Sequence, residues 1–272
     1  MASGRASFSV TKQPLFAFVA AICIFALYLP IATYVAFAFN SSGTGSQWES
    51  FTIKWFVKAW QNSEIQQAAL LSAEIAAVAA TLATAMATLA AIATTRTSPY
   101  RGQTFTYAII NQPLIVPEIV TAVALLIFFA RIKVWTDYTG LAYLIAAHTA
   151  FCIPFAYLPI RARLEGMDLT LETAAADLYA NGWRTFRYVT LPLLWPGIIA
   201  GYMLAFVISL DDVVITEFVK SSGQDTLPTF MLGQIRRSIT PELNAAATGF
   251  FALSVFAVTV FYVINRKRSQ QQ

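Results

Sequence analysis

The stretch PLLWPGIIAGYMLAFVISLDDVVITEF, residues 192–218, begins with an apolar run and then presents two adjacent aspartates, Asp211 and Asp212. The run alone is close to the ~20 apolar residues that span a bilayer as a helix. Blocks of this kind occur at roughly 15–39, 68–95, 105–130, 140–162, 193–219 and 245–264. The chain is therefore predicted to cross a membrane several times, with acidic side chains inside one crossing.

The composition favours an all-α integral membrane protein. Hydrophobic residues make up 57% of the 272 residues and charged residues 12%, about half of the ~25% charged share of a soluble domain. Lipid accepts only helices or closed barrels, and long blocks rich in Ala and Leu lack the alternating pattern of barrel strands. We predict about six transmembrane helices in a single transmembrane domain, residues 1–272, with its core at about 68–264 and its first helix at 15–39.

The distribution of Lys and Arg predicts the orientation of these helices. With the N-terminus in the cytoplasm, 11 of the 18 basic residues lie on the cytoplasmic side, as the positive-inside rule requires. Both termini are then cytoplasmic, and the net charge of +4 reflects membrane topology rather than nucleic-acid binding. The first apolar block exceeds the ~7–15 residues of a signal-peptide core, so we expect it to be a membrane helix rather than a cleaved signal.

Side chains that usually bind metals or carry out catalysis are scarce. Cys23 and Cys152 lie in separate apolar blocks, without metal-site or disulfide spacing. The single histidine, His148, is expected to hydrogen-bond between helices, with a proton relay as the alternative. The sequence contains no G-x-x-x-x-G-K-[ST] motif for nucleotide phosphates. We therefore expect no enzyme activity, metal or cofactor in this chain, and an integral-membrane enzyme is the rival class.

The gap at residues 163–192 is too regular for a loop. Its apolar residues recur at spacings near three and four, which favours a short amphipathic helix at about 166–182. The recurring residues are Met167, Leu171, Ala174, Ala175 and Leu178. Asp168 and Thr170 are candidate N-caps, and Gly182 is the expected C-terminal stop.

This gap resembles the EAA loop of permease subunits in bacterial ATP-binding-cassette (ABC) importers. The family pattern is Glu-Ala-Ala, three residues, Gly, nine residues, a β-branched residue, one residue and then Leu-Pro. Leu191-Pro192 puts Val189 in the β-branched slot and Ala174-Ala175 in the two Ala slots. The resemblance implies a cytoplasmic coupling helix that docks on a separate ATPase subunit.

Two positions of the pattern differ. Thr173 stands in the Glu slot with Glu172 beside it, and Tyr179 stands in the Gly slot with Gly182 three residues later. The family's ion pair and turn at residues 173 and 179 are therefore left open. The residues expected to couple to the ATPase are Glu172, Thr173, Ala174, Ala175, Leu178, Tyr179 and Gly182.

The resemblance extends over most of the chain. The segments PLIVPEIV (113–120), AHTAFCIPFAYLPIRARLEGMDLTLE (147–172) and SLDDVVITEF (209–218) are similar to the polyamine branch of these permeases. They look most like the second permease of spermidine/putrescine importers, which typically reads SLDDF where this chain reads SLDDV. The resemblance implies the type I permease fold in a bacterial inner membrane. The implied partners are a second, different permease, two copies of an ATPase that bind ATP and Mg, and a periplasmic substrate-binding protein.

On this resemblance the expected substrate is a small cationic solute, a polyamine such as putrescine or spermidine. The same machine importing an opine, an amino-acid derivative or a phosphonate is the alternative. A stand-alone secondary carrier is a further alternative, although it would leave the amphipathic helix without a purpose.

The two aspartates are expected to serve different purposes. An Asp at the bilayer centre costs about 2.5–3.5 kcal/mol on insertion scales, so it faces a cavity or a partner. If 193–219 is one helix, Asp211 lies roughly 27 Å along it, and the next residue points ~100° away. Ser209, Asp212 and Thr216 then form one polar stripe, which favours Asp212 for the substrate pathway and Asp211 as an anchor between helices.

Glu118 is a second acidic candidate for the pathway. It follows Pro117, with Pro113 four residues earlier, so the third block is expected to bend, with Glu118 roughly 20 Å along it. Acids on the third and fifth helices would flank a cation, and Tyr202 and Phe206 would add cation–π contacts. The alternatives are a purely structural lock for the aspartates, and a salt bridge or helix–helix hydrogen bond for Glu118.

Overall fold

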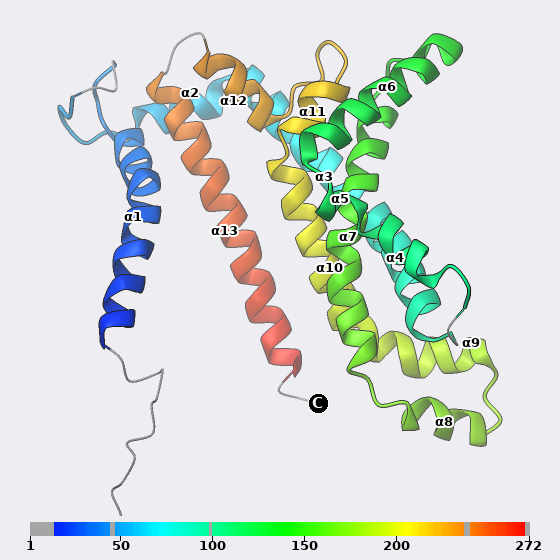
Figure 1. The fold of residues 1–272 in the computed structure, drawn as a ribbon. Helices are drawn as coiled ribbons and strands as arrows, with labels where there is room; N and C mark the ends of the chain where they lie inside the picture. Colours follow the sequence, from blue (N-terminus) through cyan, green and yellow to red (C-terminus); the bar gives the residue numbers. More distant parts are fainter. Residues whose placement is uncertain (1–13, 44–46, 98–99, 237–239, 270–272) are drawn as a thin grey trace, which may run out of the picture. The chain divides into compact units, whose positions relative to one another are not determined.

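The computed structural model describes residues 14–43, 47–97, 100–236 and 240–269, without the side chains of residues 14, 15, 257 and 260–269. Within these residues the regular secondary structure is helical, apart from one antiparallel bridge between Asn40 and Phe51, and short turns and loops connect the helices (Figure 1). The elements are α1 (Pro14–Ala38), α2 (Lys54–Gln61), α3 (Ser63–Thr95), α4 (Gln103–Ile110), α5 (Gln112–Ile115), α6 (Glu118–Thr136), α7 (Ala142–Glu165), α8 (Thr170–Asp177), α9 (Gly182–Thr185), a π-helical turn (Phe186–Thr190), α10 (Leu191–Asp211), α11 (Val214–Val219), α12 (Leu227–Ile235) and α13 (Pro241–Ser269).

Five helical stretches in the described residues are long and apolar enough to cross a membrane. They are Phe16–Ala38, Ser63–Thr95, Glu118–Thr136, Ala142–Glu165 and Gly182–Asp211. The sixth predicted span, 245–264, falls within α13, part of whose side chains lie outside the described residues. The all-α membrane fold predicted from the sequence is confirmed.

The chain divides into two compact units, Met1–Gln61 with Arg237–Ala252, and Asn62–Arg236 with Leu253–Gln272. In the first unit, Asn40 organises the turn after α1. Its side chain donates to the carbonyl of Gln47 (2.6 Å) and accepts from the backbone N–H of Glu49 (3.0 Å). Its own carbonyl accepts from the indole N–H of Trp55 (2.8 Å). The buried Asn40 therefore fixes the path of the chain between α1 and α2.

The core of the second unit is formed by α3, α7 and α10, which pack against one another. The face of α3 that is buried there consists largely of alanines, among them Ala76, Ala80, Ala83, Ala87 and Ala91. Small side chains let membrane helices approach closely, so dispersion contacts replace the hydrophobic effect that lipid does not supply. The long second block of the sequence is therefore alanine-rich because it is the central packing helix.

Two glycines on α10 bring it into contact with α7. A Cβ added at Gly201 would lie 2.6 Å from the carbonyl oxygen of Ala156, and one at Gly197 would lie 2.7 Å from Cβ of Arg163. The spacing is that of the G-x-x-x-G motif, which permits close helix crossing in membranes. The contact at Gly197 and Gly201 was not predicted, although the spacing of the two glycines is visible in the sequence.

The third and fifth predicted spans are not continuous helices. The third is divided into α4, α5 and α6, with Val116 extended before Pro117, because proline disfavours a helical residue in front of it. Glu118 therefore begins α6, and its predicted position roughly 20 Å along a helix is wrong. The fifth begins earlier than predicted, at Gly182, and ends at Asp211; Asp212 is extended before α11 begins.

Gly201→Ala tests the close packing of α7 and α10. The added methyl meets a backbone carbonyl that cannot rotate away, so the free energy of unfolding should fall by about 1–3 kcal/mol, measured as a lower thermal midpoint of the purified protein. Gly233→Ala is the matched control, because no atom lies within 4 Å of its added Cβ. Equal melting of the Gly201 variant and the wild type would contradict this packing.

Candidate functional site

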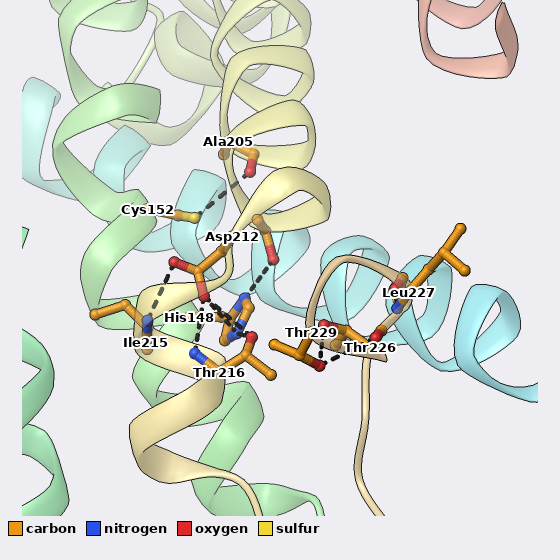
Figure 2. Close-up of polar contacts among 11 residues, drawn as sticks. His148, Cys152, Ala205, Asp212, Ile215, Thr216, Thr226, Leu227 and Thr229 are labelled. Carbon is orange, nitrogen blue, oxygen red and sulfur yellow. Dashed lines mark hydrogen bonds and ion pairs between the residues drawn. The ribbon is translucent and has the colours of Figure 1, made fainter. Parts of the chain in front are cut away.

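A buried polar cluster lies at the junction between the end of α10 and the start of α11 (Figure 2). We call the side chains of His148, Ser209, Asp212 and Thr216 the break cluster; all four are buried. His148, on α7, lies 2.8 Å from Ser209 Oγ through Nδ1 and 2.9 Å from Thr216 Oγ1 through Nε2. The prediction that His148 hydrogen-bonds between helices is confirmed.

Asp212 holds the first turn of α11. Its Oδ1 accepts from the backbone N–H of Thr216 (2.8 Å) and from the Thr216 hydroxyl (3.0 Å), and its Oδ2 accepts from the N–H of Ile215 (3.4 Å). The first N–H groups of a helix have no partner within the helix, and a carboxylate there also complements the helix dipole. The carboxylate of Asp212 is thus occupied by the protein itself.

The donors in the break cluster can be assigned by following the hydroxyl groups. Because the Thr216 hydroxyl donates to Asp212, its oxygen must accept from His148, so Nε2 of His148 carries the proton. Nδ1 of the neutral ring is then an acceptor and takes the hydroxyl proton of Ser209. The bonds run in one direction, from Ser209 through His148 and Thr216 to Asp212, and connect α7, α10 and α11.

The acids beside this cluster are less enclosed. Asp211, the last residue of α10, is exposed, and Glu118, the first residue of α6, is partly buried. α6 packs against α11, and Glu118 lies close enough to Asp212 for the two carboxyl groups to interact, so the break before α6 and the break after α10 lie together. The two breaks bring Glu118 near a pair of adjacent aspartates that follow it by more than 90 residues in the sequence.

The helical stripe predicted for Ser209, Asp212 and Thr216, which favoured Asp212 for the pathway, does not form. The prediction assumed one helix through residues 209–216, whereas the helix ends at Asp211. The residues Ser209, Asp212 and Thr216 do gather, but by hydrogen bonding to His148 and to one another rather than along an exposed stripe. Asp212 anchors the break, and Asp211 is the more accessible of the two aspartates.

The two aromatic candidates, Phe206 and Tyr202, lie on α10, about one and two helical turns before the break. Tyr202 and Phe206 stack with ring centroids 6.2 Å apart and planes inclined by 20°. Both rings are partly buried and pack against the apolar core. A contact of these two rings with a cation stays a prediction. Among the described residues, no group of three or more His, Cys, Asp or Glu side chains could hold a metal ion.

The segment expected to couple to an ATPase lies at the opposite end of α7 and α10 from α11 (Figure 1). Its helix, α8, is shorter than the predicted 166–182 and spans Thr170–Asp177. The predicted N-caps, Asp168 and Thr170, are wrong, because Leu169 is the N-cap residue and makes no side-chain capping bond. The Asp168 carboxylate instead accepts from the Thr170 N–H (2.9 Å) just before the helix, and this bond lowers the pKa of Asp168. Gly182 does not end the helix; it begins α9, capped by Asn181.

The turn after α8 is made by Tyr179, the residue in the family's Gly slot. Its φ of 59° is left-handed, a conformation for which glycine is normally favoured at helix C-termini. The N–H of Ala180 bonds back to the carbonyl of Ala175 (3.0 Å), which closes the helix end. The turn is therefore present without glycine, and its geometry leaves Leu178 82% exposed, Tyr179 95% exposed and Trp183 69% exposed.

Glu172 points into the protein, unlike these apolar side chains. Its Oε1 lies 3.3 Å from Nε of Arg96, at the end of α3, and accepts the Thr190 hydroxyl at 3.0 Å. Thr173, in the family's Glu slot, bonds through its hydroxyl to the carbonyl of Leu169 (3.1 Å). Arg96 and Thr190 were not predicted as partners of Glu172, because no local pattern connects Glu172 to residues 76 and 18 positions away.

Known proteins that match this chain in sequence include permease components of transport systems. A family model described as the inner membrane component of binding-protein-dependent transport systems matches residues 87–270. The putrescine transport system permease protein PotI of Escherichia coli K12 is 32% identical over 249 residues, covering 90% of this chain and 89% of PotI. The spermidine/putrescine transport system permease protein PotC of Haemophilus influenzae is 36% identical over 243 residues, covering 89% of this chain and 93% of PotC.

Solved structures show the same fold. A bacterial ABC transporter involved in the import of the acidic polysaccharide alginate matches with a TM-score of 0.70 at 17% identity, covering 93% of this chain and 95% of that one. The MetNI methionine ABC transporter matches with a TM-score of 0.64 at 17% identity, covering 75% of this chain and 95% of that one. The all-α ABC permease fold predicted from the sequence is confirmed.

Thr216→Val tests the break cluster. The substitution keeps the shape but removes the hydroxyl, leaving a buried His148 N–H without an acceptor, so the free energy of unfolding should fall by about 1–3 kcal/mol. Thermal unfolding of the purified protein measures this loss. Thr81→Val is the control, because the exposed Thr81 hydroxyl bonds only within its own helix, to Ala77. A Thr216 variant that melts no lower than the Thr81 variant would contradict the assigned hydrogen bonds.

Proposed function

The chain belongs to the inner membrane components of binding-protein-dependent transport systems, and on this premise we propose that it is the permease subunit that carries a polyamine, putrescine or spermidine, into the cell. Members of this family are transport components and not enzymes. The chain is a multi-pass membrane protein, because several of its helices are long and apolar enough to cross a membrane. The observation that carries the polyamine proposal is the meeting of two helix breaks, which place Asp211 and Glu118 beside the enclosed Asp212.

Charge supports a cationic solute. An acid within a membrane-spanning region needs a partner or a watery cavity, and Asp211 has no hydrogen-bond or ion-pair partner among the described residues. An ammonium group passing this point would meet a carboxylate in surroundings of low dielectric constant, where opposite charges attract more strongly than in water. Relatives of this chain are named for putrescine and spermidine transport, which supports a solute with two or more ammonium groups.

We propose different roles for the three acids, supported by the geometry of the two breaks. Asp211 is the residue we propose to contact the substrate, with Glu118 as a second contact across the break and Tyr202 and Phe206 as aromatic neighbours. Asp212 and Ser209 fix the backbone that presents Asp211, because their polar atoms are bonded within the break cluster. The separation of a structural acid from a binding acid explains why two adjacent aspartates occur there.

The energy source and partners complete the proposal. We propose that Leu178, Tyr179 and Trp183 anchor α8, with its alanines Ala174 and Ala175, on an ATPase homodimer that binds ATP and Mg. Exposed apolar and aromatic side chains of this kind dominate interface energies. A second, different permease would complete the passage, a periplasmic binding protein would deliver the solute, and both termini of this chain would be cytoplasmic.

The proposal is tested by reconstituting the complex encoded with this chain in lipid vesicles and measuring uptake of labelled putrescine and spermidine. We expect uptake that requires ATP, the ATPase and the binding protein, and that is competed by unlabelled polyamine. Uptake of an opine, an amino-acid derivative or a phosphonate in preference to polyamines would refute the substrate. Uptake by this chain alone, without an ATPase, would refute the importer.

Two single substitutions separate the acids. Asp211→Asn should lower polyamine uptake at limiting substrate by at least about tenfold, because a hydrogen bond to a charged group is worth about 1.5–3 kcal/mol, without changing the thermal midpoint. Asp212→Asn should lower the thermal midpoint, since an amide N–H would face the donor of Ile215. Glu64→Gln, at the exposed start of α3, serves as the charge control. Normal uptake by the Asp211 variant would overturn the assignment.

A further inference from the structure

The three side chains Arg96, Glu172 and Thr190, which we call the clamp, join three separate elements. Arg96 follows the last residue of α3, Glu172 lies in the first turn of α8, and Thr190 ends the π-helical turn before α10. One carboxylate oxygen, Oε1 of Glu172, faces both partners, at 3.3 Å from Arg96 and 3.0 Å from Thr190. The short helix α8 is thereby tied to the ends of two core helices.

Through Thr190, the clamp contacts a long helical stretch that ends at Asp211. From Gly182 to Asp211, α9, the π-helical turn and α10 form one uninterrupted helical stretch of 30 residues, about 44 Å at 1.5 Å per residue. Its first residues lie beside α8 and its last residue is the exposed acid at the break. A displacement transmitted to its base is therefore carried toward Asp211. π-Helical turns within α-helices often mark functional positions, and this one lies directly at the clamp.

We propose that Arg96 and Glu172 are positioning residues that make α8 move together with α3 and α10, so that displacement of α8 by the ATPase reaches the acids at the break. This inference rests on the proposed function as an ATP-driven permease. It assigns Glu172 a role within its own chain, instead of a contact with the ATPase. The docking surface is then left to the exposed side chains Leu178, Tyr179 and Trp183.

The clamp is largely buried. The side chains of Arg96 and Glu172 are only 18% and 23% exposed, so removing one charge leaves the other poorly compensated and costs more than breaking a surface ion pair. Two nitrogens of Arg96, Nε and Nη2, make no hydrogen bond within the described residues, so Nε meets Glu172 as an ion pair only. Each clamp variant is therefore first checked for folding and assembly, and a variant that passes should have an α8 that is no longer fixed to α3 and α10.

The test measures polyamine uptake and ATP hydrolysis by the same reconstituted complex. Glu172→Gln and Arg96→Gln should lower the uptake per ATP hydrolysed about fivefold or more, the scale of an ordinary coupling between sites, while ATP hydrolysis continues. The exchanged pair Arg96→Glu/Glu172→Arg should recover at least part of this ratio. Thr190→Val, which removes only the hydroxyl, should lower the uptake per ATP hydrolysed to a smaller degree. This variant tests the clamp if the complex with Glu172→Gln does not assemble.

Glu165→Gln is the matched control. It breaks the 2.7 Å ion pair between Arg161 and Glu165, which lies within α7 and is more exposed than the clamp, so uptake per ATP should not change. An unchanged ratio in the clamp variants, or equal losses of uptake and hydrolysis without recovery in the exchanged pair, would overturn the clamp. A wild-type complex without ATP-driven uptake would instead refute the proposed function on which the clamp rests.

Discussion

A carboxylate within an apolar span must find a partner, and this constraint shapes the centre of the second unit. Asp212 meets it by ending α10 and accepting hydrogen bonds from the first turn of α11. His148 and Ser209 extend the bonding to α7 and α10, so that no member of the cluster is left without a partner. The cost of burying one acid is offset locally, and the neighbouring acid, Asp211, is held exposed at the end of a helix.

The same helix has a second end with a different purpose. At its base, the clamp holds α8 against α3 and α10, while the apolar side chains around Tyr179 face outward. The glycines of α10 keep it in close contact with α7 along the way. The proposed docking surface therefore lies beside one end of this tightly packed helix, and the proposed substrate contact, Asp211, lies at the other.

Sequence patterns predicted the parts of this arrangement that depend on composition and local spacing. Long apolar blocks located the membrane helices, Pro117 indicated the break before Glu118, and the Ala174-Ala175 and Leu191-Pro192 register located α8. The break at Asp212 was missed because residues 209–216 fit a helical stripe and contain no proline or glycine. The available signal was an aspartate inside an apolar run, since aspartate is also a strong helix N-cap. The left-handed Tyr179 had no signal, because left-handed backbone is uncommon for residues other than glycine. The partners of Glu172 depend on tertiary packing.

The most direct measurement is a cryo-electron microscopy structure of the assembled complex in lipid with a polyamine bound in the passage. Our account predicts an ammonium group at ion-pair distance from the carboxylate of Asp211, with Asp212 still accepting its bonds from Thr216. A polyamine that contacts Asp212 after the break cluster has opened, or that binds away from both helix breaks, would contradict it.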